Sequence, residues 1–326
     1  MDTNQRTPQH KPALAIFATV GSLWVFVLVT LGAFTTSIGA GMAFPDWPLS
    51  DGSINPLGWL TEIDKFAEHS HRLSASLMSS ITIILAVWLW LTEERSWLRR
   101  LGYFAVGLVL TQAAVGGLRV LFDHQHIDLV NTSLGRLFAM LHAVLAQAFV
   151  CTLFAIAIAS SRPWIEGSSG WTGVSSQRLR QLGVVCVALL FGQLSIAAVV
   201  RHSFSGLAIP TFPLSTPEGN LLPALWDFRV SIHFAHRVMA GVVTLAIIAL
   251  VRQLWREPST PTALRWLGIG LLGLISLQIY LGAQIIWTGR SVSMTTGHVI
   301  IGALTLAVTF LLTCFTYHGS IKTDPA

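Results

Sequence analysis

Residues 41–50 read GMAFPDWPLS, and residues 206–215 read the similar GLAIPTFPLS. A His-Arg dipeptide recurs at the same offset, at positions 71–72 and 236–237. Similarity repeated at a fixed offset indicates a duplicated unit. We therefore predict a molecule of two homologous halves, each pairing a Pro-rich loop with a His-Arg dipeptide at the start of an apolar segment.

The composition is that of a membrane protein. Of the 326 residues, 53% are hydrophobic and 11% are charged, and the mean hydropathy is +0.65. Soluble domains carry about 25% charged residues, so we predict an integral membrane protein. Charge-free apolar runs long enough to cross a bilayer lie at residues 13–35, 73–91, 101–118, 137–160, 182–200, 233–251, 264–287 and 293–317.

These runs predict an all-α integral membrane protein with eight transmembrane helices, four in each half. We expect an N-terminal half at residues 1–160, a cytoplasmic linker at 161–180 and a C-terminal half at 181–326. Because each half has an even number of spans, both halves enter the membrane with the same polarity and form a parallel repeat. The expected architecture is two pseudo-symmetric four-helix bundles side by side.

The Lys and Arg residues are biased to one side of the membrane. The two tails and the second, fourth and sixth connecting loops hold 12 of the 20. Because short basic loops stay inside, we expect both termini in the cytoplasm and the first and fifth loops outside, in a bacterial plasma membrane. This bias explains the net charge of +5, so membrane lipid is an expected partner and nucleic acid is not.

Four histidines lie at similar depth, on the even-numbered spans near their outer ends: His71, His142, His236 and His298. Two histidines facing each other in one membrane layer can hold the iron of a haem between them. We therefore predict two pairs, one in each half. Glycines near the second member of each pair, at positions 135, 297 and 302, are expected to make room for the macrocycle. Solvation at the interface is the alternative for any one of the four taken alone.

The remaining histidines and the cysteines are expected to have no such role. We predict a solvated position for the tail residues His10 and His318, exposure for the outer-loop residues His124, His126 and His202, and an incidental position for His69. All three cysteines fall inside predicted spans, so no disulfide is expected in an outer loop.

The two halves differ at one informative position. Glu68 precedes His71 by three residues, whereas the matching position before His236 is His233. Spacing of i to i+3 places Glu68 and His71 on one helix face, where a carboxylate close to a haem could move protons. We therefore predict one reactive site and one electron-transfer site. The alternative is that Glu68 is an acidic residue favoured at a helix N-terminus.

Arg72 and Arg237 are candidates for contacts with haem propionates, because arginine pairs well with carboxylates. Four other arginines also lie toward the outer side, at positions 119, 136, 201 and 290. Plain anchoring at the membrane interface is the alternative for each.

Across nearly its whole length the chain resembles the haem A synthase family. The resemblance is carried by the Gly-x-Ala-x-Pro-Asp-Trp-Pro loop at 41–48, by Glu-x-x-His-Arg at 68–72, by His-x-x-His-Arg at 233–237, and by the lone histidines His142 and His298.

The resemblance implies a function for each half. The first half would hold the substrate haem O between His71 and His142, with Glu68 as the catalytic acid. The second half would hold haem b between His236 and His298. The implied reaction oxidises a ring methyl group of haem O to the formyl group of haem A through successive hydroxylations. Haem O synthase and cytochrome oxidase assembly factors would be the partners.

The sequence also departs from the family. Many members carry a cysteine pair in the first loop, where this chain has Phe44 and Ser50, so a thiol-based step cannot be carried over. In the second Pro-rich loop, at residues 206–215, Thr211 and Phe212 replace the Asp-Trp of the first Pro-rich loop. Two other classes stay open. A dihaem b-type cytochrome for electron transfer alone would place its haems at different depths, and a secondary transporter would need interrupted helices near the midplane.

Overall fold

The computed structural model describes residues 9–128, 132–166 and 175–321. Its elements in chain order are α1 (Pro12–Ser37), α2 (Ile63–Thr92), α3 (Ser96–Leu121), β1 (His126–Ile127), β2 (Thr132–Ser133), α4 (Leu134–Ser160), α5 (Arg162–Glu166), α6 (Gln177–His202), α7 (Phe228–Arg256), α8 (Thr262–Trp287) and α9 (Val292–Ile321). Eight of these helices, all except α5, are long and apolar enough to cross a membrane. This finding confirms the predicted all-α membrane fold.

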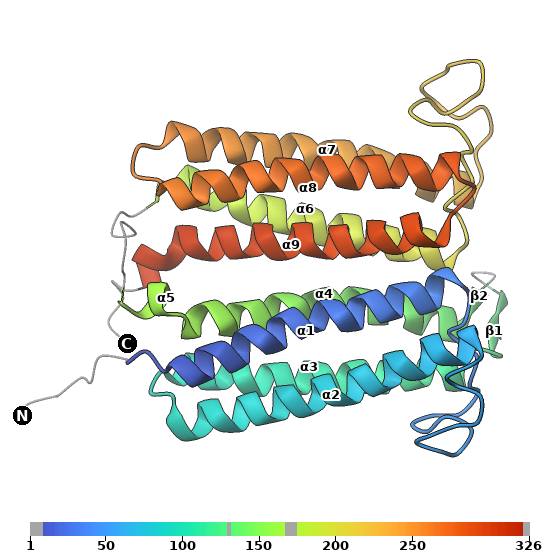
Figure 1. The fold of residues 1–326 in the computed structure, drawn as a ribbon. Helices are drawn as coiled ribbons and strands as arrows, with labels where there is room; N and C mark the ends of the chain where they lie inside the picture. The colour runs from blue at the N-terminus through green and yellow to red at the C-terminus, as the bar shows by residue number, and fades with distance from the viewer. Residues whose placement is uncertain (1–8, 129–131, 167–174, 322–326) are drawn as a thin grey trace, which may run out of the picture.

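The long helices run side by side, with α1 to α4 forming one group and α6 to α9 the other (Figure 1). Within the first group α1 and α3 each pack against α2 and α4, and in the second group α6 and α8 each pack against α7 and α9. The groups meet through α1, α4, α6 and α9. This arrangement is consistent with two pseudo-symmetric bundles, while the domain boundaries stay a prediction.

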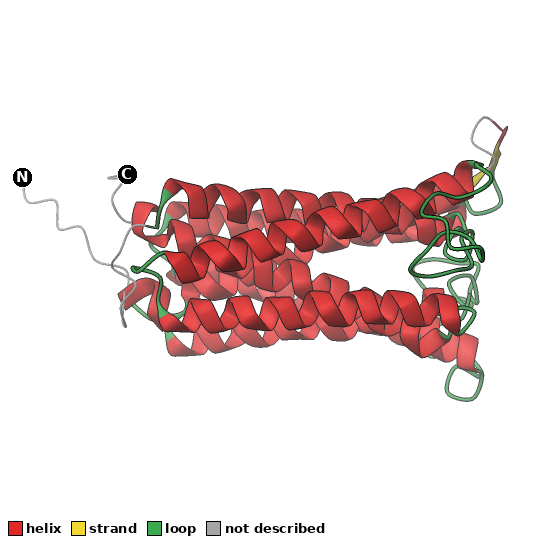
Figure 2. Ribbon diagram, turned by 90° about the horizontal axis from the view of Figure 1, so that it is seen from above, coloured by secondary structure: helices red, strands yellow, loops and turns green. Residues whose placement is uncertain are grey.

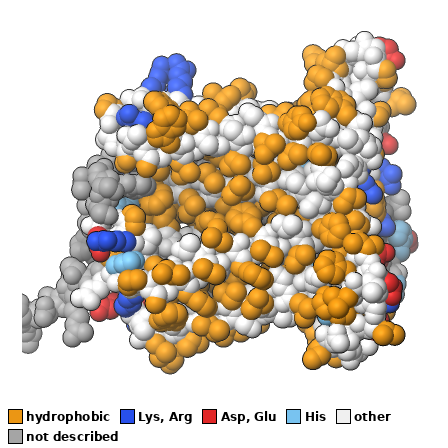
Figure 3. Space-filling view, in the orientation of Figure 1, with side chains coloured by type: hydrophobic (Ala, Val, Ile, Leu, Met, Phe, Trp, Pro, Cys, Tyr) orange, Lys and Arg blue, Asp and Glu red, His pale blue; other side chains and the backbone are white. Residues whose placement is uncertain are grey.

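Both Pro-rich loops lie at one end of the bundle, here called the loop end, and α1 begins and α9 ends at the opposite end (Figure 1). The two layers of helices diverge toward the loop end (Figure 2). Apolar side chains cover the middle of the visible face, and charged side chains lie mostly at its two ends (Figure 3). Such a belt is what a lipid-exposed surface requires.

The molecule has two buried cores, one mainly in each group of helices, and both are concentrated away from the loop end. The first core includes Leu14, Leu89 and Leu153, and the second includes Leu179 and Leu254. The dense apolar packing therefore holds the helices together at the far end, while the paired histidines lie where the layers diverge.

The helices begin earlier than the hydropathy predicts, and for two of them the extra residues include part of the candidate site. α2 begins at Ile63 rather than at residue 73, and α7 begins at Phe228 rather than at residue 233. The first turns of both carry charged and histidine side chains, which a search for apolar runs excludes. Asp227 caps α7, because its carboxylate accepts a hydrogen bond of 2.7 Å from Val230 N–H. The His-Arg dipeptides are consequently inside their helices and not at the first residue.

Candidate functional site

The four paired histidines lie in one layer. His71, His142, His236 and His298 each stand about two turns inside the loop-side end of α2, α4, α7 and α9 respectively. All four residues are half-buried. The structure thus brings the predicted residues to matched depth in the two halves.

The second pair has the geometry of two ligands to one metal. The ring centres of His236 and His298 are 6.3 Å apart, with an angle of 60° between the ring planes. Two iron–nitrogen bonds of about 2 Å, plus about 1 Å from each nitrogen to its ring centre, give a separation of about 6 Å. The separation of the ring centres therefore fits two imidazoles that would bind one iron between them.

Contacts behind the second pair orient both rings. His298 Nδ1 lies 3.1 Å from the carbonyl oxygen of Gln278 on α8. His236 Nδ1 lies 3.1 Å from the amide nitrogen of Gln193 on α6, which also donates to the His236 carbonyl. Whichever way the Gln193 amide is turned, Nδ1 of each ring is engaged. The Nε2 atoms make no hydrogen bond within the described residues, as an iron ligand requires.

The first pair packs against glycines of the neighbouring helices. A Cβ added to Gly32 of α1 would lie 2.8 Å from Cε1 of His71, and one added to Gly116 of α3 would lie 3.3 Å from Cε1 of His142. The Nδ1 atoms of both rings are buried, and the backbone of Leu28 and of Gln112 lies close to His71 and His142 respectively. The glycines therefore set how closely each ring approaches the next helix.

Two helices that were not predicted to contribute, α3 and α8, support the second histidine of each pair. Gly282 of α8 lies against the His298 ring as Gly116 of α3 lies against the His142 ring. Each glycine follows a glutamine by four residues, Gln112 in the first half and Gln278 in the second. This Gln-x-x-x-Gly pattern, repeated on α3 and α8, was the available signal in the sequence. Of the three glycines expected to make room for the macrocycle, Gly135 packs on the backbone of Arg119 and Asp123 and Gly302 lies against the Gln278 amide, and the role of all three stays a prediction.

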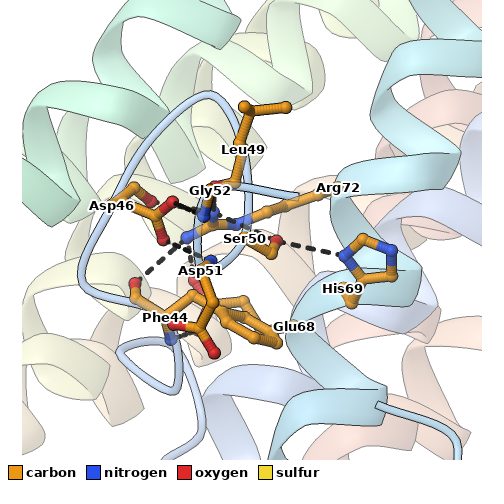
Figure 4. Close-up of polar contacts among 9 residues, drawn as sticks. All are labelled: Phe44, Asp46, Leu49, Ser50, Asp51, Gly52, Glu68, His69 and Arg72. Carbon is orange, nitrogen blue, oxygen red and sulfur yellow. Dashed lines mark hydrogen bonds and ion pairs between the residues drawn. The ribbon is translucent and has the colours of Figure 1, made fainter. Parts of the chain in front are cut away.

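Arg72 holds the first loop in place (Figure 4). Its guanidinium donates to the carbonyl oxygens of Phe44 at 3.2 Å, Asp46 at 2.8 Å and Leu49 at 2.5 Å. It also lies over the Phe44 ring, 5.6 Å from the ring centre. These donors are thus committed to the loop.

Glu68 is buried, with 4% of its surface exposed. Oε1 accepts a hydrogen bond of 2.6 Å from Arg72, and Oε2 accepts one of 3.1 Å from Phe44 N–H. The carboxylate therefore fastens the loop to α2 through one ion pair and one backbone contact (Figure 4).

The second loop is held in the same way by different residues. Arg237 donates to the carbonyl oxygens of Ile209 at 3.0 Å and Thr211 at 2.7 Å. His233 occupies the place of Glu68, with Nδ1 facing Ile209 N–H at 3.2 Å and Nε2 facing Arg237 Nε at 3.3 Å. The predicted difference between the halves is thus the replacement of the Glu68 carboxylate by the His233 imidazole. In both halves this side chain lies between the arginine of the His-Arg dipeptide and the backbone of the Pro-rich loop.

The Asp46 carboxylate closes the turn of the first loop, because it accepts hydrogen bonds from the N–H groups of Asp51 at 2.9 Å and Gly52 at 2.8 Å. Burial by itself raises the pKa of Asp46, but these two N–H groups and the charge of Arg72 lower the pKa below the ordinary 3.8. The ionised form of Asp46 is therefore part of the folded loop.

Several minor predictions about histidines were wrong. His69 is not incidental, since it is 4% exposed and its Nδ1 lies 3.0 Å from Ser50 Oγ. His318 is not solvated, since it is 3% exposed and its Nε2 lies 2.7 Å from the Trp164 carbonyl oxygen. His10 and His202 are half-buried, and His124 and His126 are exposed as expected.

The fold and these sites define a multi-pass membrane protein with two histidine pairs at one depth. The model of the COX15-CtaA family, described as cytochrome oxidase assembly protein, matches residues 15–310. The chain belongs to this family, which confirms the resemblance drawn from its motifs.

Three relatives named heme A synthase match most of the chain. The protein of Halalkalibacterium halodurans is 27% identical over 315 residues, covering 93% of this chain and 95% of its own length. That of Bacillus licheniformis is 26% identical, covering 87% and 89%. That of Rhodospirillum centenum is 25% identical, covering 90% and 86%.

Proposed function

We propose that this protein is a haem A synthase, an oxidoreductase that converts haem O to haem A. Family membership and the relatives of that name support the activity. The observation that carries the proposal is the pairing of four histidines in one layer, with a buried acid beside the first pair and, among the described residues, none beside the second. The acid is Glu68, three residues before His71.

The second half is the cofactor site in this proposal. His236 and His298 would bind the iron of haem b, in keeping with their ring separation of 6.3 Å. Haem b held by two imidazoles supplies reversible one-electron transfer. Gln193 and Gln278 hold the two rings in the orientation that presents Nε2.

The first half is the substrate site. His71 and His142 would hold the iron of haem O, and a ring methyl group would become a formyl group by successive hydroxylations and loss of water. Glu68 is the proton-handling group. Its two oxygens now accept from Arg72 and Phe44 N–H, so a proton taken up at either oxygen weakens one of these contacts and loosens the loop from α2.

Arg72 and Arg237 stay a prediction as partners of the haem propionates. Their described hydrogen bonds connect each of them to its own loop and to the residue four positions before it on the same helix. A propionate would therefore have to share these guanidinium groups with the loop carbonyls.

The loop end is proposed to face outward, with both termini in the cytoplasm of a bacterial cell. This orientation follows from the Lys and Arg bias of the loops. Haem O synthase would deliver the substrate, and cytochrome oxidase assembly factors would receive haem A.

An electron carrier with two haems and no chemistry is the competing function. A carrier across the membrane needs haems near opposite faces, whereas here all four histidines lie about two turns inside the same end of the bundle. The matched depth favours two cooperating sites over a transmembrane route.

Haem extraction and mass spectrometry of the purified protein test the proposal. We expect haem b together with haem O, haem A or a hydroxylated intermediate. Glu68→Ala should keep haem b and accumulate haem O without haem A. Glu62→Ala is the matched control, because Glu62 is an exposed acid paired with Lys65 just before α2. Haem b alone in the unaltered protein would favour the electron carrier.

A further inference from the structure

Arg119 lies close to the first histidine pair, His71 and His142. Unlike Arg72, it makes no hydrogen bond to the first Pro-rich loop among the described residues. It stands in the last turn of α3, three residues after Gly116. Its guanidinium lies directly against Gly41, where any added side chain would collide with it. It is also within electrostatic range of both His71 and His142. The charge thus lies between the first loop and the first histidine pair.

Within the described residues Arg119 makes no hydrogen bond or ion pair. Two acids are in electrostatic range, Glu68 and Asp123. Glu68 is paired with Arg72 at 2.6 Å, and Asp123 accepts from Ser133 Oγ at 3.4 Å. A partly buried cation without a counter-ion is costly, so the site lacks an anion.

A second cation close to Arg119 increases the need for an anion at this site. Arg201 of α6 reaches across to the first half, where it donates to the Ala33 carbonyl at 2.6 Å and to Ser37 Oγ at 3.0 Å. It is within electrostatic range of Arg119. Since the dipole of a helix C-terminus stabilises a cation only weakly, the end of α3 does not account for both charges.

Within the described residues, the second half has no cation at the position that corresponds to Arg119. The residue three positions after Gly282 is Ile285, and a Cβ added to Gly206, the counterpart of Gly41, would meet nothing within 4 Å. Arg119 is thus restricted to the half that contains Glu68.

We propose that Arg119 binds a carboxylate of the macrocycle held between His71 and His142, and so recognises the acidic edge of the substrate. Arg72 instead fixes the loop above that site. This inference rests on the proposed function, because it takes a dicarboxylate macrocycle as the ligand of the first pair. A planar guanidinium with its N–H groups unengaged is suited to such a group.

The test compares a dicarboxylate ligand with its ester. Haem b and haem b dimethyl ester are titrated into the full-length protein in lipid nanodiscs, with His298→Ala removing the second site. Dissociation constants are read from the absorption shift of the bound haem. We expect haem b to bind at least about tenfold more tightly than the ester, as one charge-assisted contact implies.

Variants assign the difference to Arg119. Arg119→Gln should weaken haem b binding about 10- to 100-fold and leave ester binding within about threefold, while Arg119→Lys should fall between. Arg136→Gln is the matched control, because Arg136 lies at the same end of the bundle but stacks over Phe204 at 5.0 Å. It should change neither constant.

The outcomes separate this inference from the proposed function. If the His298→Ala protein gives no bis-histidine spectrum with haem b, the ligand assignment of the first pair fails. If it gives one, equal losses for acid and ester in Arg119→Gln, or no loss for either, overturn the role of Arg119. Should Arg119→Gln not fold, as judged by circular dichroism and gel filtration, the His298→Ala protein with Arg119 intact still decides. Equal binding of haem b and its ester to that protein overturns the proposal.

Discussion

At the residue scale, Glu68 and His233 face equivalent N–H donors, but a carboxylate and an imidazole differ in how many hydrogen bonds they can accept. A carboxylate can satisfy Phe44 N–H with one oxygen and Arg72 with the other. A neutral imidazole has a single acceptor nitrogen, although both ring nitrogens of His233 face N–H donors. The first loop is therefore held by a complete ion pair and the second by weaker contacts.

Loss of the Arg72 side chain tests the strength of this ion pair. Arg72→Leu leaves a buried carboxylate without its cation, so we expect a cost of about 3 kcal/mol in unfolding free energy. Thermal unfolding in detergent measures it. The double variant with Glu68→Gln should recover most of the loss, and a double variant as unstable as the single one would contradict the account. Arg162→Leu, which breaks the exposed pair with Glu166, should leave the midpoint unchanged.

The lowered pKa of Asp46 predicts an acid-sensitive loop. Because the folded-state pKa lies below 3.8, the ionised carboxylate stabilises the loop above that pH, and this stabilisation is lost as the pH falls through the folded-state pKa. Protease cleavage within the first loop, measured from pH 7 to pH 3 with an acid-active enzyme, should increase at the acid end. Asp46→Asn should be cleaved readily throughout, and a cleavage rate equal to that of the unaltered loop at pH 7 would refute the role of Asp46.

At the element scale, glycines of α1, α3 and α8 determine how closely each helix approaches a histidine ring. Gly32, Gly116 and Gly282 all lie within tight contact of a ring when a Cβ is added. Since each of these helices belongs to the same half as the ring it touches, each four-helix group builds its own site.

Gly32→Ala should displace the His71 ring. The added Cβ would lie 2.8 Å from Cε1, and such overpacking costs about 1–3 kcal/mol. We expect weaker binding of haem at the first site, followed by its absorption spectrum, with the second site unaffected. Gly192→Ala on α6 is the control, because its Cβ would meet nothing within 4 Å. An unchanged first-site spectrum in Gly32→Ala would show that the ring can move at no cost.

Hydropathy and the internal sequence repeat predicted which helices exist better than they predicted where each helix begins and ends. The eight spans and the matched depth of the four histidines followed from apolar runs and a fixed offset. The polar first turns of α2 and α7 did not, because residues such as Lys65 and Glu68 hide a helix from a search for apolar segments. The Arg72 contacts with Phe44 and Leu49 depend on how a loop folds back, which no local pattern specifies.

At the scale of the whole molecule, the two halves are joined near both sites. Arg201 of α6 donates to Ala33 and Ser37 at the end of α1, and Thr296 of α9 donates to Ser37 Oγ at 3.2 Å. Ala33 follows Gly32, which touches the His71 ring, and Thr296 precedes His298 by two residues. Hydrogen bonds of Arg201, Ser37 and Thr296 therefore connect the surroundings of His71 to those of His298.

Reporter fusions test the proposed orientation. A fluorescent protein that matures only in the cytoplasm should be bright at the C-terminus. Alkaline phosphatase, which is active only outside the cytoplasm, should be active when inserted after Gly219, in the segment between α6 and α7 that contains the second Pro-rich loop. The reverse pattern would place the loop end and the histidine pairs in the cytoplasm.

The central claim is that the two histidine pairs hold different haems, and ligand variants of each pair test it most directly. Haems are extracted from purified His71→Ala and His236→Ala proteins and quantified by mass spectrometry against the unaltered protein. The account predicts that His71→Ala loses haem O and haem A but keeps haem b, and that His236→Ala loses haem b. Loss of the same haem from both variants, or of none from either, would contradict it.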